Sequence, residues 1–182
     1  MDRRNRYEAA FEAYLQWHRL CYVAVHEGRR TFLGETRVKN LDFIVHAQGG
    51  LGLLVDVKGR RYPGGKATKK RKVWECWSTQ DDVDGLERWE TVFGQGYHGL
   101  LLFIYLLGRD EAPADDLGDL WTWQGQRYLL RGVTALDYRR HLRVRSPRWR
   151  TVHMSSAAFR QSARPFHYFT HEFHPEPAEC PF

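Results

Sequence analysis

Cysteine is scarce in this chain, and its spacing argues against two common ways of stabilising a small fold. The 182 residues include three cysteines, Cys21, Cys76 and Cys180, which lie far apart. They do not form the Cys-x-x-Cys spacing of a zinc site, and an odd number of distant cysteines does not indicate a disulfide framework. We therefore expect free thiols.

Long apolar runs and phosphate-binding loops are also missing. No uninterrupted apolar segment approaches the roughly 20 residues of a membrane-spanning helix. The amino terminus, rich in Asp and Arg, does not resemble a signal peptide, so a cytoplasmic protein without a membrane partner is the simplest interpretation. A Walker-type Gly-rich loop is lacking too, which argues against an enzyme acting on small phosphorylated substrates.

Positive charge, by contrast, is abundant and unevenly distributed. The formal net charge is +6; residues 58–72 contain eight Lys or Arg and no acid, and residues 127–164 contain ten Arg and the single acid Asp137. Such blocks are typical of nucleic-acid-binding proteins, although each block taken alone could be a solvated face. The residues predicted to bind nucleic acid are Arg60, Arg61, Lys66, Lys69, Lys70, Arg71, Lys72, Arg139, Arg140, Arg143, Arg145, Arg148 and Arg150.

The length fits a single domain that can bury a sizeable core. We expect one domain over residues 1–182, because no internal repeat or long linker divides the chain. Its core is predicted to span about residues 6–107. A C-terminal β-hairpin and basic helical extension follow at about 118–173, and residues 174–182 form a tail.

Hydrophobic periodicity predicts the main elements. Residues 6–15 have aromatic side chains at helical spacing, and Ser78 or Thr79 can cap a helix that ends near Gly94. The nearly continuous apolar run 100–107 is typical of a central strand in a three-layer α/β domain. Further predictions are a strand at 21–25, an exposed loop at 59–73, a hairpin of 120–123 with 127–130, a helix capped by Thr134, a strand at 148–152 and a final helix from Ser155 or Ser156 to Ala163.

Two acids and a lysine are the most informative feature of the sequence. Asp42 lies in the apolar run 40–45, and Asp56 and Lys58 end the run that follows Gly49 and Gly50. Alternate residues of a strand face the same side, so Asp56 and Lys58 point together. If the glycines form the turn of a hairpin, Asp42 lies beside Asp56.

This arrangement suits a hard divalent cation. Paired carboxylates bind Mg²⁺ or Mn²⁺ through oxygen, and the metal and a neighbouring lysine favour attack by water on a phosphodiester. In this hypothesis Asp42 and Asp56 ligate the metal, with help from the Val57 carbonyl. Lys58 orients or deprotonates the attacking water.

An acid followed by a strand with Asp-x-Lys resembles the PD-(D/E)xK nuclease superfamily, which includes restriction endonucleases and Holliday-junction resolvases. The resemblance implies a three-layer, restriction-endonuclease-like α/β fold, in which helices flank a central mixed β-sheet. In the resolvase-like branch a glutamate on the first helix completes the metal site, and Glu8 occupies that place here. By analogy, a homodimer would pair two sites to cut two strands.

The first helix also resembles the signature of the HYExAFE family of small proteins of undefined function. Residues 7–12 read Tyr-Glu-Ala-Ala-Phe-Glu, but Arg6 stands where the signature has His. The resemblance extends through Asp42, Asp56-Val57-Lys58 and the tryptophan-rich stretch that follows, and so covers roughly residues 6–107.

Each of these residues has a simpler alternative role. Asp42 could bond the backbone at a strand end, Asp56 and Lys58 could form an exposed ion pair, and Glu8 could interact with the helix dipole. For Trp74 and Trp77, packing is favoured over stacking on bases, and metal binding by the histidines at 167, 171 and 174 is disfavoured.

The sequence therefore predicts a Mg²⁺- or Mn²⁺-dependent nuclease, with DNA favoured over RNA. The alternative is a catalytically inactive nucleic-acid-binding protein on the same fold.

Overall fold

The structure is a computed structural model that describes residues 5–25, 31–33, 36–63, 73–109 and 120–175. For residues 31–33 and 36–38 it describes the backbone alone. The elements in chain order are α1 (Arg6–Trp17), β1 (Cys21–Ala24), β2 (Thr31–Leu33), β3 (Thr36–Val38), β4 (Phe43–His46), the 3₁₀ turn η1 (Gln48–Gly50), β5 (Gly52–Arg61), β6 (Trp77–Thr79), α2 (Gln80–Phe93), β7 (Tyr97–Leu107), β8 (Leu120–Trp123), β9 (Gln126–Thr134), α3 (Ala135–His141), β10 (Arg143–Ser146), β11 (Thr151–His153), α4 (Ser156–Ser162), β12 (Arg164–Pro165) and α5 (Phe166–His171).

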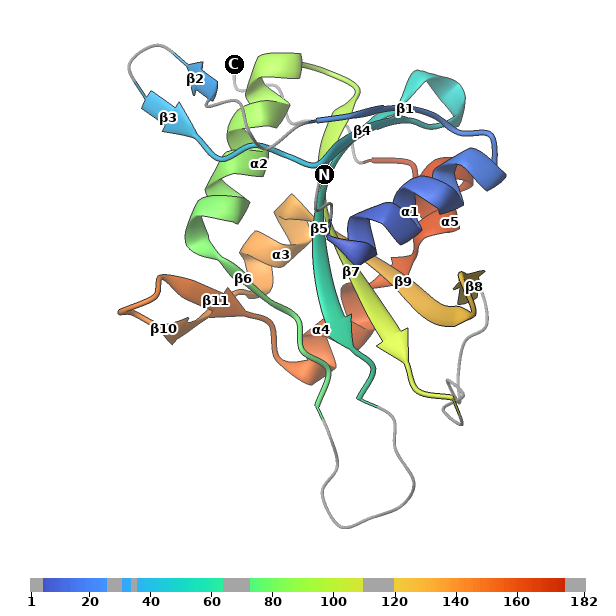
Figure 1. Cartoon of the computed structure of the whole chain (residues 1–182). Helices are drawn as coiled ribbons and strands as arrows, with labels where there is room; N and C mark the ends of the chain where they lie inside the picture. The colour runs from blue at the N-terminus through green and yellow to red at the C-terminus, as the bar shows by residue number, and fades with distance from the viewer. Residues whose placement is uncertain (1–4, 26–30, 34–35, 64–72, 110–119, 176–182) are drawn as a thin grey trace.

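A mixed sheet forms the middle of the molecule, in the order β1-β4-β5-β7-β9-β12, with β8 paired to β9 (Figure 1). The central strands β5 and β7 are parallel, and the other pairs in this sheet are antiparallel. Helix α2 connects the two parallel strands, as a crossover between parallel strands requires.

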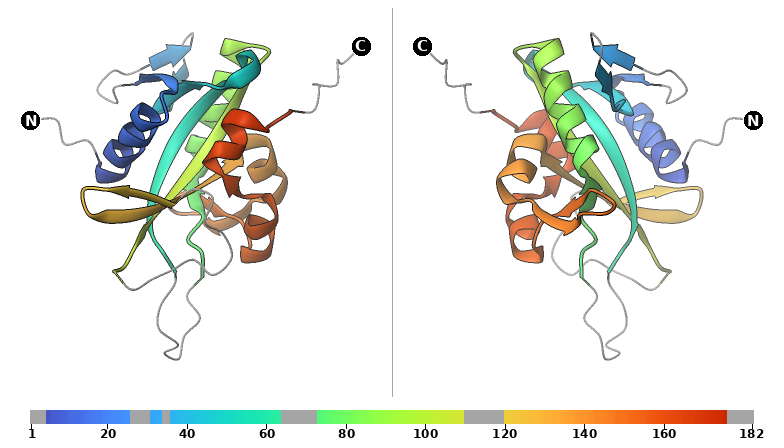
Figure 2. Two further views of the ribbon diagram at one scale, coloured as in Figure 1. Left: turned by 90° about the vertical axis from the view of Figure 1, so that its right-hand side faces the viewer. Right: turned by 90° about the vertical axis from the view of Figure 1, so that its left-hand side faces the viewer.

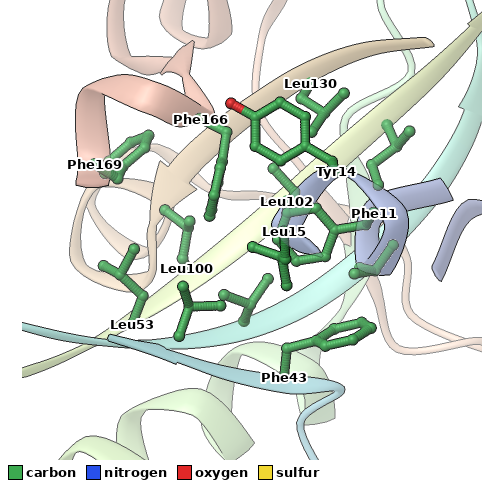
Figure 3. Packing of buried hydrophobic residues seen from close by; sticks show 14 of the residues in the cluster. Phe11, Tyr14, Leu15, Phe43, Leu53, Leu100, Leu102, Leu130, Phe166 and Phe169 are labelled. Carbon is green, nitrogen blue, oxygen red and sulfur yellow. The ribbon is translucent and has the colours of Figure 1, made fainter. Parts of the chain in front are cut away.

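Helices cover both faces of this sheet, so the domain has three layers (Figure 2). Helices α1 and α5 pack on one face, where Phe11 and Phe166 meet edge to face with ring centroids 4.9 Å apart (Figure 3). Helices α2, α3 and α4 pack on the other face through residues such as Leu86, Tyr138 and Phe159. The predicted fold class is confirmed.

Close contact between α1 and β5 depends on Gly59. A Cβ atom at this position would lie 2.1 Å from Cδ2 of Tyr7, a distance that real Cβ atoms do not adopt. Only glycine therefore lets the first turn of α1 approach β5, and the same turn carries Glu8.

Several predicted elements match the structure, including α1, α2 and the β8–β9 hairpin. Cys21 and Cys76 are free thiols as expected, whereas Cys180 lies outside the described residues. In the described part of the chain no helix is long and apolar enough to cross a membrane.

Strand β9 pairs with the central strand β7 along its length, so residues 126–134 extend the central sheet beyond the predicted core. Other predictions were wrong. The expected strand at 148–152 is instead the turn and second strand of the β10–β11 hairpin, because Arg150 N–H bonds back to the Pro147 carbonyl. Residues 59–61 continue β5 and are not a loop, and α5 follows the helix expected to be the last.

Candidate active site

The β4–β5 hairpin brings Asp42 beside Asp56. Phe43 pairs with Val55, and the Asp42 N–H donates to the Val55 carbonyl at 2.9 Å. Gly49 and Gly50 have φ values of 74° and 81°, which lie in the left-handed region that favours glycine and allow the tight connection. The backbone therefore places Asp42 beside Asp56, as the sequence predicts.

Asp42 is buried among groups that oppose its ionisation. Oδ2 accepts a 2.6 Å hydrogen bond from the Val57 N–H, and the residue is 7% exposed. Burial, and then the charges of Asp56 and Glu8, raise the pKa of Asp42 to about 8, although the Val57 bond opposes this shift. The effect of Glu8 places the first turn of α1 within electrostatic reach of Asp42.

Asp56 and Lys58 form a buried ion pair on one face of β5. Lys58 Nζ lies 3.0 Å from Oδ1 and 2.8 Å from Oδ2 of Asp56, and only the Oδ1 contact has hydrogen-bond geometry. Burial raises the pKa of Asp56 despite this partner. Burial alone would lower the pKa of Lys58, but Asp56 and Asp82 together raise it, so the lysine is held as an ammonium.

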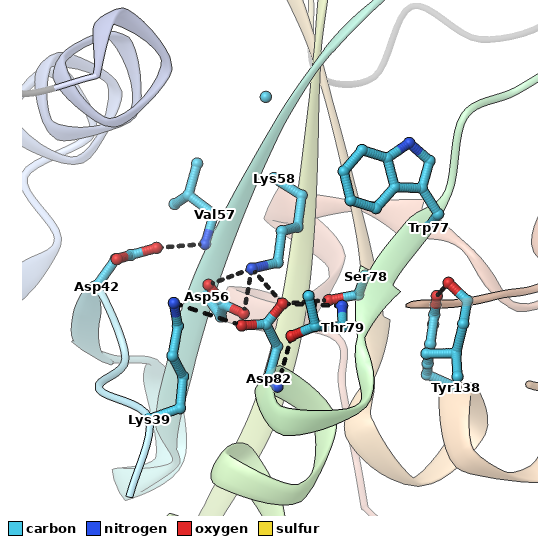
Figure 4. Close-up of polar contacts among 12 residues, drawn as sticks. Lys39, Asp42, Asp56, Val57, Lys58, Trp77, Ser78, Thr79, Asp82 and Tyr138 are labelled. Carbon is cyan, nitrogen blue, oxygen red and sulfur yellow. Dashed lines mark hydrogen bonds and ion pairs between the residues drawn. The ribbon is translucent and has the colours of Figure 1, made fainter. Parts of the chain in front are cut away.

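Asp82 is a member of the site that the sequence did not reveal. Its Oδ2 lies 2.9 Å from Lys58 Nζ and accepts bonds from Ser78 Oγ at 2.9 Å and the Thr79 N–H at 3.0 Å (Figure 4). Burial opposes ionisation, but Lys58 and the Thr79 bonds outweigh it and lower the pKa of Asp82 to about 2.

The local sequence explains where Asp82 stands. Thr79 caps α2 by accepting from the Asp82 N–H at 3.1 Å while the Asp82 carboxylate bonds back to the Thr79 N–H, which is a capping box. Lys39 adds a second, half-exposed cation 3.7 Å from Asp82 Oδ1. The cluster thus joins β5, the start of α2 and the segment before β4.

The oxygen donors suit a hard divalent cation. In a strand the N–H and C=O of one residue point to the same side, so the Val57 carbonyl points, like its N–H, toward Asp42, beyond the end of the β4–β5 ladder. Among the described residues no three His, Cys, Asp or Glu side chains form a ready metal-binding group. An ion between Asp42 and Asp56 would take oxygens from these aspartates, from the Val57 carbonyl and from water, all of which are ligands that Mg²⁺ accepts.

The residues predicted to bind nucleic acid have diverse environments. Arg60 donates to the carbonyls of Gly59 and Trp77 and stacks over the Trp77 ring at 4.1 Å. Arg139 is held by Asp84 at 2.5 Å and Glu87 at 2.7 Å.

Other predicted arginines lie nearer solvent. Arg61, Arg140, Arg143, Arg145, Arg148 and Arg150 are exposed, and of these Arg140 lies 3.8 Å from Asp137 and Arg150 lies 2.9 Å from Asp81. The residues at 66, 69, 70, 71 and 72 lie outside the described residues.

The fold is similar to that of a solved structure, described as a 1.6 Å resolution structure of Archaeoglobus fulgidus Hjc, a Holliday junction resolvase from an archaeal hyperthermophile. The TM-score is 0.52, and the match covers 91% of this chain and 98% of the resolvase at 13% sequence identity. This similarity supports the restriction-endonuclease-like fold alone.

No family model and no curated protein matches this sequence. The resemblance to the HYExAFE family therefore gains no support from these comparisons.

Removal of the Asp82 charge should destabilise the protein, because the buried Lys58 ammonium would lose one of its two carboxylate partners. We expect Asp82→Asn to lower the free energy of unfolding by about 3 kcal/mol, because one acid would remain to balance the ammonium. Asp81→Asn is a matched control in the same turn of α2; its exposed pair with Arg150 predicts a loss below about 1 kcal/mol. Equal losses of unfolding free energy in the two variants, measured by chemical denaturation, would contradict this account.

The raised pKa of Asp42 should make stability depend on pH. Between pH 4 and 8 the folded state retains a proton that the unfolded chain, with its ordinary pKa of 3.8, has released. The free energy of unfolding should therefore fall as pH rises, by at most about 1.4 kcal/mol per pH unit from this group. In Asp42→Asn the decline between pH 5 and 8, measured by urea denaturation in EDTA, should be shallower; parallel curves would refute the assignment.

Proposed function

We propose that this protein is a metal-dependent nuclease, which hydrolyses phosphodiester bonds in nucleic acid and favours DNA. The observation that carries the proposal is the convergence of Asp42, Asp56 and Lys58 at the open end of the β4–β5 ladder, on a fold similar to that of a resolvase. The fold alone is compatible with many functions, so the argument rests on this site.

In this proposal Asp42, Asp56 and the Val57 carbonyl hold Mg²⁺ or Mn²⁺, with Glu8 bound directly or through water. A bound divalent cation would stabilise negative charge on the phosphate and make water a better nucleophile. Asp42 must lose its proton to act as a ligand, so the site is expected to exchange a proton for the metal.

Lys58 is assigned an electrostatic role. With its pKa raised by two buried acids, the ammonium is poorly suited to accept a proton from water. It can instead donate hydrogen bonds that orient the attacking water and offset charge developing on the phosphate. This assignment refines the sequence-based expectation that Lys58 orients or deprotonates the water.

The proposed contacts with nucleic acid involve the exposed arginines near this end of the molecule. Arg61, Arg143, Arg145 and Arg148 remain the best candidates, because Arg60 and Arg139 already bind groups of the protein. The basic residues at 66 and 69–72 stay in the proposal on sequence grounds. A homodimer that aligns two sites on two strands also remains part of the proposal.

One observation favours the alternative, a binding protein without catalysis. Lys58 bridges Asp56 and Asp82, and an ammonium in that place competes with a metal for the Asp56 carboxylate. Such a protein would bind DNA with strong salt dependence, and Asp56→Ala would leave its affinity unchanged or strengthen it.

Cleavage of a labelled panel tests the proposal: single-stranded, duplex, flap and four-way-junction DNA, and RNA, each with Mg²⁺, Mn²⁺ or EDTA. We expect metal-dependent cutting by the wild type, none by Asp56→Asn, and a roughly 100-fold or greater rate loss in Lys58→Ala with DNA binding retained. Asp81→Asn serves as the matched control and should cut normally. Binding without cutting under every metal would support the alternative, and equal cutting by Asp56→Asn would exclude this site.

A further inference from the structure

A cavity of about 630 Å³ lies beyond the acidic cluster, outside the residues assigned to catalysis. Its walls come from the end of β5, the segment before β6 and the β11–α4 connection. The volume is within the range of cavities that hold small organic molecules. The residues that matter for its chemistry are Arg61, Trp74, Glu75, Trp77, Arg145 and His153.

The indoles in this cavity pack against neighbouring side chains. Trp74 packs edge to face on Tyr105 with ring centroids 4.7 Å apart, and Trp77 has the guanidinium carbons of Arg60 and Arg145 within 4.1 Å and 5.2 Å of its ring centroid. The Tyr138 hydroxyl lies behind them, 2.8 Å from the carbonyl oxygen of Cys76 and 3.1 Å from that of Val152, and donates its one proton between the two. Half-buried aromatic rings that line a cavity are suited to stacking on a planar ligand.

The charged and polar groups specify that ligand further. Among the described lining residues Arg61 and Arg145 are basic and Glu75 is acidic, which favours an anion. His153 lines the same cavity and adds an imidazole to its polar groups.

The cavity lies a short distance along β5 from the acidic cluster. Arg61 follows Lys58 by three residues of β5, which is about 10 Å along a strand. This length corresponds to about three stacked nucleotides. Trp77 adjoins Ser78, whose hydroxyl bonds Asp82, so the cavity and the acidic cluster share the β6 segment (Figure 4).

We propose that this cavity binds one unpaired nucleotide of the nucleic-acid substrate, with its base against the tryptophans and its phosphate near Arg61 and Arg145. The inference rests on the proposed action on nucleic acid and names a substrate class: strands with an unpaired nucleotide about three nucleotides from the cleaved bond. A fully paired duplex cannot fill the cavity, because its bases are stacked within the helix.

Binding experiments in EDTA test the cavity separately from catalysis. The probes are a duplex with a short single-stranded flap that contains 2-aminopurine, and a fully paired duplex of equal length. The wild type should bind the flap roughly 10-fold more tightly and quench 2-aminopurine fluorescence, as expected for stacking of a base on an aromatic side chain. Unquenched fluorescence with equal affinities would overturn the proposal.

Two variants and a matched control assign the effect to the cavity. Arg145→Ala and His153→Ala should bring the ratio of flap affinity to duplex affinity close to one. Melting temperatures should confirm that both variants fold. Arg143→Ala removes the same charge from the same strand outside the cavity, and should weaken both probes equally. An unchanged preference in both cavity variants would refute the assignment.

A competition experiment with free dAMP tests whether the cavity binds a nucleotide within a strand or a free mononucleotide. If dAMP binds as tightly as the flap and displaces it, the cavity serves free nucleotides and the strand assignment is wrong. The flap should instead bind far more tightly, because the rest of the strand adds phosphate contacts. If the protein prefers the flap but cleaves nothing in the metal panel, the nucleotide-binding cavity is supported and the proposed nuclease activity is rejected. If it cleaves but does not prefer the flap, the nuclease activity is supported and the nucleotide-binding cavity is rejected.

Discussion

The site depends on the burial of one ammonium group between two carboxylates. Lys58 is largely excluded from water, and an isolated charge in that position would be prohibitively costly. Asp56 on the same strand and Asp82 at the start of α2 balance it at 2.8 Å and 2.9 Å. The start of α2 and the middle of β5 must therefore keep their relative positions, and this requirement fixes the geometry of the candidate site.

The same arrangement does little to stabilise a negative charge on Asp42. It has the Val57 N–H as a hydrogen-bond donor, while Asp56 and Glu8 oppose its negative charge. A divalent cation would relieve the repulsion among these acids, and the Val57 carbonyl, on the same side of β5, can contribute a neutral oxygen. Strand β5 thus supplies the acid, the carbonyl and the lysine, and at its end it reaches the aromatic cavity.

Much of this arrangement was predictable from local sequence. Alternation placed Asp56 and Lys58 together, and two glycines marked the turn that aligns Asp42. Asp82 was not predictable, because capping alone accounts for an acid in the first turn of a helix, and its contact with Lys58 arises only when α2 packs on the sheet. Likewise, no local pattern shows that β9 joins β7, or that Arg60 and Arg139 bind partners within the protein.

The most direct test of the central claim is a crystal structure of the protein grown with Mn²⁺, with the metal located from its anomalous scattering. The account predicts one ion bound by oxygens of Asp42 and Asp56 and by the Val57 carbonyl. Lys58 should then keep its contact with Asp82 and give up part of its contact with Asp56. An ion bound elsewhere, or none at saturating Mn²⁺ with the Asp56–Lys58–Asp82 contacts unchanged, would contradict the account.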